Sequence, residues 1–473
     1  MESAASLRRR ADALVQQGRY AEAAATYRRE AALRRRMGDP NGALVEERKA
    51  DRWSSEIRLF VHGPDAKPKS VRSAPRALWE PGYGCYLGAF LDRDERAGRP
   101  MVDENHQTHR DPDAFADLTG KKHASVFCYL SYGRRFPARW VSWLKARNVA
   151  PHIAWEPNAG LEPVQDDDYL RRFADDACRA DCPIFVRFAS EMNGDWTRYG
   201  GDPARYKRAW NIVRSVLQRR APNVALVWCV NAIPEAPIPR FYPGDDQVDW
   251  VGVNCYSVPF HDNNVNRPGL HENPADLFRT VYGLYAARKP IMLCEWGASR
   301  RSSVDGRDRS DWAALKIAQM YAALPRLYPR VKMIDIFDCD NLRYAQPGRQ
   351  LNDYSVTNSE TVRAAYAAAI APDYFLSDIP VQSGDAPTPI APLADGWRCA
   401  LGKITVSAWV RSYVGRPAVR YLLDGREVFR SSVPGPYRAE LNLTAPGAHR
   451  LVGIVSDDRG RAAARQERTI IVG

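Results

Sequence analysis

The sequence predicts an α/β protein in which a (β/α)8 barrel is flanked by an N-terminal α-helical segment and a C-terminal all-β sandwich. Three observations predict this fold class. Residues 80–372 contain eight short apolar runs, several of them separated by amphipathic stretches with helical periodicity. Residues 4–60 are rich in Ala, Leu, Arg and Glu and contain one proline, Pro40. The residues after 396 alternate between apolar and polar side chains in short runs separated by turn sequences.

The chain of 473 residues has the length expected of about three domains. Two Pro-containing stretches, PDAKPKSVRSAP and the longer APDYFLSDIPVQSGDAPTPIAPLAD, separate the patterned segments and are typical of linkers. We therefore predict five segments: a helical segment (1–62), a linker (63–79), a barrel (80–372), a Pro-rich linker (373–395) and a β-sandwich (396–473).

The N-terminal segment contains a turn sequence, QGRYAEA at 17–23, that resembles the inter-helix turn of a tetratricopeptide repeat. GDPNGA at 38–43 resembles a second, weaker copy. The small alanines permit close packing of two helices. Such repeats need about three copies to bury a continuous core alone. We therefore expect these helices to dock on the next domain or on a partner protein.

The eight apolar runs of the central segment lack the alternation of a half-exposed strand. Strands that are apolar on both faces are typical of parallel sheets covered by helices, and eight of them in about 290 residues fit a (β/α)8 barrel. The runs are Tyr83–Phe90, Ala124–Leu130, Ala150–Trp155, Pro183–Phe188, Val224–Val230, Val248–Cys255, Pro290–Cys294 and Val331–Phe337. The alternative is an open doubly wound sheet, which would usually carry a Gly-rich phosphate loop after the first strand; GAFLDRDERAG is not one.

The C-terminal segment predicts a small β-sandwich. Its turn sequences include Asp424-Gly425 and Pro434-Gly435. The predicted strands are Lys403–Val410, Ala418–Leu423, Glu427–Ser431, Arg438–Leu443, Ala448–Ser456 and Gln466–Val472. The pattern VRYLLDGREVF followed by PGPYRAELNLTAPGAHRLVGIVSDDRG resembles the immunoglobulin-like modules that are appended to many bacterial extracellular enzymes.

Composition excludes several classes of protein. With 45% hydrophobic and 26% charged residues, the chain is not an intrinsically disordered protein. No run approaches the ~18 apolar residues of a membrane span. The N-terminus lacks the apolar block of a secretory signal. We expect a protein that is cytoplasmic as synthesised; release by a non-classical route, or prior removal of a leader, are the alternatives.

The net charge of +12 is concentrated in the two arms, with +6 in residues 1–75 and +5 in residues 385–473. We interpret these charges as solvated surface, since no nucleic-acid motif accompanies them, and we expect no nucleic-acid partner. The nine cysteines suit reduced, buried thiols, and no Cys/His set completes a zinc site. We expect neither a metal nor an organic cofactor.

Two glutamates follow strongly apolar runs, Glu191 after the fourth and Glu295 after the seventh. Catalytic residues of barrel enzymes stand at the C-terminal ends of the strands. A charged side chain at the end of such a strand costs free energy unless it has a task or a partner. Paired carboxylates are what glycosidic bond cleavage needs, one as an acid and one as a nucleophile or base. The alternative is that the glutamates anchor ion pairs, with Arg187 as one candidate partner.

The segment Arg187–Trp196, RFASEMNGDW, resembles the acid/base motif of glycoside hydrolase family 26, a family of retaining glycosidases built on (β/α)8 barrels. Four further segments resemble the same family in the expected order: PHIAWEPNAG, YPGDDQVDWVGVNCY, KPIMLCEWG and FDCDNLRYAQPGRQLNDYSV. The resemblance covers about 290 residues. It implies endo-acting hydrolysis of β-linked polysaccharides, most often β-1,4-mannan, with net retention.

The resemblance implies a role for individual residues. Glu191 matches the general acid/base and Glu295 the nucleophile. Arg187 and Asn193 match supports of the acid site, and Tyr256 matches an aromatic residue whose hydroxyl contacts the nucleophile. The candidates for sugar-stacking walls are Trp155, Trp196, Trp228 and Trp296.

One position departs from the family pattern. The residue before the acid is His in most of the family and is Ser190 here. This position normally contacts the substrate or the nucleophile, and a hydroxyl is shorter than an imidazole and carries no positive charge. The departure bears on the substrate subtype and on the rate.

The sequence thus predicts a retaining endo-acting glycoside hydrolase that cleaves β-1,4-mannan or a related β-glycan. The alternative is a weakly active or inactive glycosidase-like barrel that serves as a carbohydrate-binding or structural adaptor in a larger assembly, with protein partners on its helical arm or sandwich. A lyase or transglycosylase on the same barrel is a third hypothesis.

Overall fold

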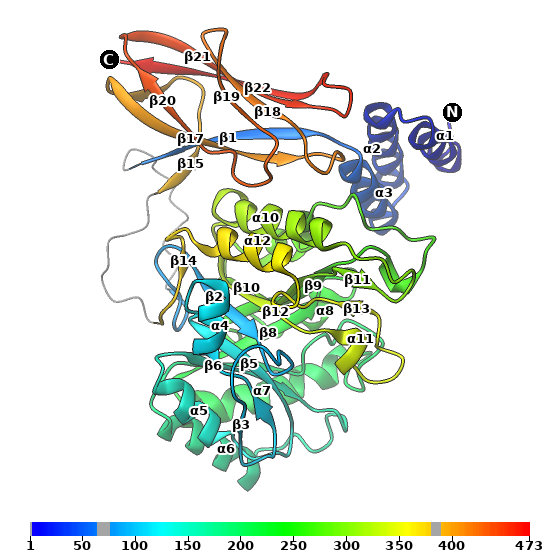
Figure 1. Cartoon of the computed structure of the whole chain (residues 1–473). Helices are drawn as coiled ribbons and strands as arrows, with labels where there is room; N and C mark the ends of the chain where they lie inside the picture. Colours follow the sequence, from blue (N-terminus) through cyan, green and yellow to red (C-terminus); the bar gives the residue numbers. More distant parts are fainter. Residues whose placement is uncertain (1, 64–75, 380–388) are drawn as a thin grey trace.

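The computed structural model describes residues 2–63, 76–379 and 389–473. Three bodies are visible: three N-terminal helices, a central barrel and a C-terminal β-sandwich (Figure 1). In the part of the chain that the structure describes, no helix has the length and apolar character needed to cross a membrane.

The barrel is a closed ring of eight parallel strands. Each strand pairs with its neighbours in sequence order, and the ring closes where the last strand pairs with the first, Met333 lying opposite Tyr86. The strands are β2 (Cys85–Phe90), β5 (Ser125–Ser131), β6 (Ala150–Glu156), β7 (Ile184–Phe188), β8 (Val224–Asn231), β9 (Trp250–Ser257), β10 (Ile291–Ala298) and β12 (Val331–Phe337). All eight apolar runs of the sequence form strands of this ring, so the predicted barrel is confirmed and the open sheet is excluded.

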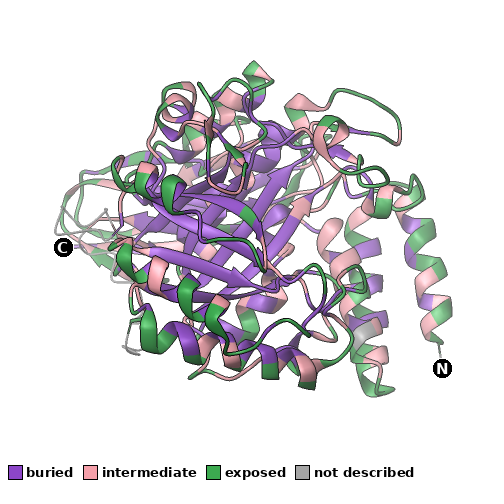
Figure 2. Ribbon diagram, turned by 90° about the horizontal axis from the view of Figure 1, so that it is seen from below, coloured by how far each residue is buried: buried purple, intermediate pink, exposed green. Residues whose placement is uncertain are grey.

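Helices surround the barrel with their apolar faces inward, which Figure 2 shows as buried strands inside helices that are exposed on one side. The helices are α4 (Pro112–Thr119), α5 (Ala138–Lys145), α6 (Asp168–Arg179), α7 (Pro203–Arg220), α8 (Ile238–Phe241), α9 (Arg279–Tyr285), α10 (Ser310–Leu327), α11 (Asn341–Tyr344) and α12 (Glu360–Ile370). Local sequence explains where several of them begin. Asp167 accepts a hydrogen bond from the Leu170 N–H at the start of α6, and Asp202 caps α7, with Pro203 in its first turn.

Short elements complete the barrel's loops. The 3₁₀ turns are η1 (His261–Asn263) and η2 (Pro274–Asp276), and the short strands are β3 (Met101–Val102), β4 (Thr108–His109), β11 (Arg301–Ser302), β13 (Asn352–Asp353) and β14 (Phe375–Leu376). Residues 77–79 cover the N-terminal end of the barrel: the Trp250 indole donates to the Leu78 carbonyl and the Trp79 indole to the Asn223 carbonyl.

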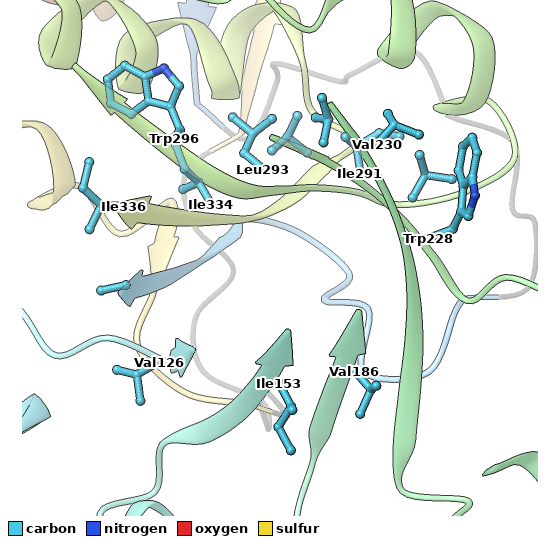
Figure 3. Packing of buried hydrophobic residues seen from close by; sticks show 14 of the residues in the cluster. Val126, Ile153, Val186, Trp228, Val230, Ile291, Leu293, Trp296, Ile334 and Ile336 are labelled. Atoms are coloured by element: carbon cyan, nitrogen blue, oxygen red, sulfur yellow. The ribbon is translucent and has the colours of Figure 1, made fainter. Parts of the chain in front are cut away.

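Strand residues alternate between two hydrophobic regions. One set points outward and packs against the helices; Val126, Ile153, Val186 and Trp228 are examples (Figure 3). The other set points into the barrel, where it forms an apolar layer at the N-terminal end. This alternation of period two decides which side chains can reach the middle of the barrel.

The sandwich contains two sheets with a common apolar core. One has the order β15-β1-β17-β20, and the other has the order β16-β22-β21-β18-β19. The strands are β1 (Glu56–His62), β15 (Ile390–Pro392), β16 (Trp397–Cys399), β17 (Gly402–Arg411), β18 (Val419–Leu423), β19 (Arg426–Ser431), β20 (Ala439–Leu443), β21 (Gly447–Ser456) and β22 (Ala462–Val472). The predicted sandwich is confirmed, and all six predicted strands are present.

Two predicted boundaries are wrong. The predicted helical segment (1–62) extends too far, because Glu56–His62 form strand β1, which pairs along its length with β17 and contributes Ile57 and Leu59 to the sandwich core. The predicted linker at 373–395 contains β14 and β15, and its residues 380–388 lie outside the described part of the chain. Most of the linker placed at 63–79 also lies outside it.

The N-terminal helices are α1 (Ala4–Gln16), α2 (Tyr20–Arg36) and α3 (Pro40–Arg52), one more than the predicted pair. They dock on the rest of the molecule as expected. Asp51 accepts a hydrogen bond from Arg279 of the barrel at 2.5 Å, and Arg52 forms an ion pair with Glu272. The ring of Tyr20 lies 4.5 Å from that of Tyr413 in the sandwich. The resemblance to tetratricopeptide and immunoglobulin-like modules stays a prediction.

Candidate active site

Both predicted glutamates lie at the C-terminal end of the barrel. A bulge in β10 turns the side chain of Glu295 inward. Along β10, Leu293 points outward and Cys294 inward, so strict alternation would send Glu295 outward. The register against β9 shifts between Leu293 and Glu295, which pairs Glu295 with the inward-facing Asn254. The bulge thereby re-aims the carboxylate into the barrel, a common use of bulges at functional sites.

The turn after β7 positions Glu191. Ala189 and Glu191 have positive φ values of 49° and 59°, a conformation that costs a residue other than glycine on the order of 1 kcal/mol or more. Neighbouring strands hold the turn, since the Ala189 N–H donates to Trp155 and the Glu191 N–H to Cys229, each at 3.0 Å. This strained conformation places the Glu191 side chain beside β8 and β9.

Glu295 is 6% exposed and accepts hydrogen bonds from three side chains. The Tyr129 hydroxyl donates to Oε1 at 2.6 Å, Arg187 also donates to Oε1, and the Tyr256 hydroxyl donates to Oε2. Burial and the negative charge of Glu295 raise the pKa of both tyrosines well above the usual value. Both phenols therefore remain protonated donors to this carboxylate.

Arg187 is fully buried inside the barrel, where its guanidinium lies 4.8 Å from the centre of the Phe127 ring. Burial opposes its positive charge, but Glu295 acting together with Tyr129 and the buried thiols of Cys229 and Cys294 outweighs burial, and the pKa of Arg187 lies well above its usual value. A buried ion pair of this kind is strongly destabilised when one partner is removed. Arg187 thus serves as the counter-charge of Glu295.

Glu191 has a different environment, made of neutral donors. Its Oε1 accepts hydrogen bonds from the side-chain amides of Asn231 at 3.0 Å and Asn254 at 2.9 Å. Its Oε2 accepts one from the indole N–H of Trp196 at 2.7 Å. Gly194 makes the last contact sterically feasible, because a Cβ at this position would lie 2.4 Å from the Trp196 ring. Among the described residues, no cation forms an ion pair with Glu191.

Asn254 joins the two carboxylates. Its amide nitrogen donates to Glu191, and its Oδ1 accepts a hydrogen bond from Arg187 at 3.1 Å. Because Arg187 also donates to Glu295, one continuous hydrogen-bond chain runs Glu191–Asn254–Arg187–Glu295. The relative position of the two glutamates is therefore set by residues of three different strands, β7, β9 and β10.

A third carboxylate lies beside this pair. Glu156, the last residue of β6, accepts hydrogen bonds through Oε2 from the Ser190 N–H at 3.0 Å and the Tyr199 hydroxyl at 2.6 Å. Burial raises the pKa of Glu156. Ser190 thus contacts this third carboxylate through its backbone N–H.

Asn193 acts on Glu191 indirectly. Its side-chain amide donates to the carbonyls of Asn231 and Pro234, both at 2.8 Å, and its Oδ1 accepts from the Asn231 N–H at 2.9 Å. These bonds fix the end of β8, from which Asn231 reaches Glu191. Asn193 is thus a positioning residue in this structure.

Three of the four predicted sugar-stacking tryptophans are in the hydrophobic core. Trp155, Trp228 and Trp296 are all 0% exposed and point outward from the barrel toward the helices (Figure 3 labels the last two). Trp155, for example, stacks on Phe173 of α6 with ring centres 3.9 Å apart. This placement contradicts the predicted stacking role, because a sugar has no access to these rings. Of the four predicted tryptophans, only Trp196, which is 39% exposed, presents ring surface to solvent beside Glu191.

Sequence reasoning missed four residues that hold the carboxylates: Tyr129, Glu156, Asn231 and Asn254. Each stands at or near the C-terminal end of a barrel strand and points inward. A parity count along each strand, combined with the rule that barrel sites lie at this end, would have found them. Within the described ranges, no group of three or more His, Cys, Asp or Glu side chains is arranged to hold a metal ion.

Fold and site together define a class: a (β/α)8 barrel that carries two glutamates from its fourth and seventh strands in one hydrogen-bonded group, as glycoside hydrolases do. The comparisons with known proteins agree with this class. Residues 164–296, which include both glutamates, match the family model described as Glycosyl hydrolase family 26.

Individual relatives are distant. A β-1,3-xylanase from a Vibrio species is 30% identical over 82 residues, 16% of this chain and 17% of that protein. Endoglucanase H from Acetivibrio thermocellus is 24% identical over 281 residues, 54% of this chain and 28% of that protein. The chain thus spans less than a third of the length of either. Among solved structures, a GH26 β-mannanase from Bacteroides ovatus is 15% identical with a TM-score of 0.42, covering 62% of this chain and 90% of its own.

Proposed function

We propose that the protein is a retaining glycoside hydrolase that cleaves a β-linked polysaccharide, with Glu295 as nucleophile and Glu191 as general acid/base. The observation that carries the proposal is the unequal set of hydrogen-bond donors around the two carboxylates. Glu295 lies against a guanidinium and two phenols, whereas Glu191 accepts bonds from two amides and an indole.

This difference between the two sets of donors suits the different roles of the two carboxylates in a double-displacement mechanism. A nucleophilic carboxylate acts as an anion, and Glu295 forms an ion pair with Arg187. An acid/base must gain and lose a proton during each turnover. Glu191 accepts hydrogen bonds from two amides and an indole, and among the described residues it forms no ion pair.

The reaction then proceeds in two steps. Glu295 attacks the anomeric carbon while Glu191 gives its proton to the leaving glycosidic oxygen, so that the C–O bond breaks and a glycosyl ester forms on Glu295. A water molecule that loses its proton to Glu191 attacks the anomeric carbon, and Glu295 leaves as a carboxylate. No step needs a metal or an organic cofactor.

The proposed substrate is a β-linked glycan cut in an endo-acting manner. The names of the distant relatives, a β-1,3-xylanase, an endoglucanase and a β-mannanase, support this class. β-1,4-Mannan or a related β-glycan remains the specific proposal. Trp196, beside Glu191, is the proposed stacking platform.

The test is a reducing-sugar screen of the full chain on mannan, mixed-linkage glucan, xylan and bacterial exopolysaccharides, with Glu295→Gln and Glu191→Gln as matched controls. We expect release of reducing ends that both variants reduce by at least about 10³-fold. NMR of the first-formed product should show the retained anomer. An inverted product would reject the retaining mechanism, and an unsaturated sugar would indicate a lyase.

A folded protein that binds these glycans but releases no product would instead favour the carbohydrate-binding adaptor.

Ser190 supplies a further test of specificity. We expect Ser190→His to raise kcat on mannan if the missing imidazole limits turnover. Strong mannanase activity of the wild type that Ser190→His lowers would reject this account.

A further inference from the structure

A cavity lies between the barrel and the sandwich. Its volume is about 700 Å³. Helices α10 and α12 form one wall, and the opposite wall comes from β15 and the loop at 432–436 that precedes β20. Figure 1 shows these two helices directly beneath the sheet that contains β1, β15 and β17. None of the residues that hold Glu191 or Glu295 lines this cavity.

Arg326, in the last turn of α10, points a buried positive charge toward this cavity. Its side chain is 9% exposed. Its Nε donates to the Ser407 hydroxyl at 3.0 Å and its Nη1 to the Ala322 carbonyl at 2.8 Å. Both acceptors are neutral, and no carboxylate among the described residues lies within ion-pair distance of this guanidinium. Elsewhere in the molecule, buried arginines such as Arg187 and Arg411 have carboxylate partners.

A second arginine lies close enough to oppose this charge. Arg438, the residue before β20, also lines the cavity and is exposed, and its side chain makes no hydrogen bond or ion pair within the described residues. Burial, and to a smaller extent the positive charge of Arg438, lowers the pKa of Arg326 to about 10, so Arg326 remains charged at neutral pH. His62 completes this side; burial and the two arginines lower its pKa to about 3, so it is neutral.

The remaining groups around Arg326 do not neutralise it. The titratable neighbours that face it are the hydroxyls of Tyr83, Tyr374 and Tyr421. Asp373 also lines the cavity, but it is exposed and its charge acts on Lys121. A buried cation without an anion is unfavourable, and an arginine fork matches the oxygens of a carboxylate or phosphate.

Much of the remaining wall is apolar, although Arg416, Thr361 and Ser432 also line it. Alanines of α10 and α12, among them Ala314, Ala318 and Ala365, face the cavity together with Ile390 and Val433. Val433 is 72% exposed, which is unusual for a large aliphatic side chain in a soluble domain. Such a wall favours a ligand body with few polar groups.

We propose that this cavity binds a small amphipathic anion, whose carboxylate or phosphate group sits on Arg326 and Arg438 and whose apolar chain lies along the alanine faces of α10 and α12. Such a ligand would bridge the barrel and the sandwich, because Arg326 belongs to the first and Arg438 to the second. This binding site is independent of glycan hydrolysis.

Titration calorimetry of the full chain tests the proposal with octanoate, octyl phosphate and uncharged 1-octanol. We expect the better anion to bind at least about 10-fold more tightly than octanol, and the stronger of the two anions identifies the head group. Arg438→Gln should weaken anion binding by about 10- to 100-fold, the usual effect of losing one charged hydrogen bond. Ala318→Leu should weaken it by filling the cavity without changing charge.

Arg398→Gln is the matched control, since Arg398 is exposed on the same module and does not line the cavity; it should leave binding unchanged. The inactive Glu295→Gln variant should bind as the wild type does, which separates this proposal from the proposed function. Failure of the folded wild type to bind either anion at millimolar concentration would overturn the proposal. So would unchanged affinities in both Arg438→Gln and Ala318→Leu.

Discussion

The environment of His109 predicts that the free energy of unfolding falls at alkaline pH. Its ring is fully buried between Asp92, which follows β2, and Asp103, with Nδ1 3.1 Å from the first carboxylate and Nε2 3.3 Å from the second. Burial opposes an imidazolium here, but the two carboxylates outweigh burial and raise the pKa of His109 to about 9, from 6.5. The same loop holds the site, because Gln107 donates a hydrogen bond to the Tyr129 carbonyl.

The magnitude follows from the pKa difference. The pKa of His109 is higher by about 2.5 in the folded state, which corresponds to roughly 3 kcal/mol of unfolding free energy at about 1.36 kcal/mol for each pH unit. Because the folded-state pKa lies above the unfolded-state value, this contribution is complete below about pH 6.5 and is lost as the pH rises through 9. Between pH 6 and pH 9 the wild type should therefore lose about 3 kcal/mol that other groups do not explain.

The assay is urea unfolding at pH 6 and pH 9, followed by tryptophan fluorescence, in the wild type and in His109→Gln. Trp140, whose ring stacks 5.0 Å from that of His109, is one of the thirteen tryptophans that contribute to this signal. The difference in unfolding free energy between the two proteins should shrink toward high pH. NMR titration should give a His109 pKa near 9. A measured pKa at or below 6.5, or a difference that does not change with pH, would refute the reasoning.

Three further predictions concern the site and its surroundings. Tyr256→Phe removes one donor from the proposed nucleophile and should lower kcat/KM by about 10- to 100-fold at unchanged Tm. Gly194→Ala should displace the Trp196 ring and lower activity to a similar extent, whereas Gly283→Ala, where a Cβ meets nothing within 4 Å, should do neither. Trp155→Phe should reduce stability by about 1–3 kcal/mol and leave KM unchanged, since this ring packs in the core; a large rise in KM would restore its predicted stacking role.

The sequence by itself determined the barrel. Eight runs that are apolar on both faces are typical of a parallel sheet covered by helices, and each of them forms a strand of the barrel. It also singled out Glu191 and Glu295, because a carboxylate at the end of such a strand is conspicuous, and Arg187 as a partner of one of them. These are local properties, visible in a few consecutive residues.

The tertiary structure alone decided which residues surround the carboxylates. Trp155 and Trp296 are adjacent in sequence to Glu156 and Glu295, and Trp228 lies three residues before Asn231, but the two-residue period of a strand sends all three rings outward into the core. The bulge that turns Glu295 inward depends on the register between β10 and β9. No local pattern contains that information, because register is a property of two strands.

Pairing between distant strands also decided where the N-terminal helical segment ends. Residues 56–62 follow three helices directly, and their strand conformation is stabilised by β17, which lies more than 300 residues further along the chain. The apolar side chains of β1 are buried only because the C-terminal module supplies the other half of their core. Burial of this kind depends on contacts between distant segments, so only the folded chain could decide it.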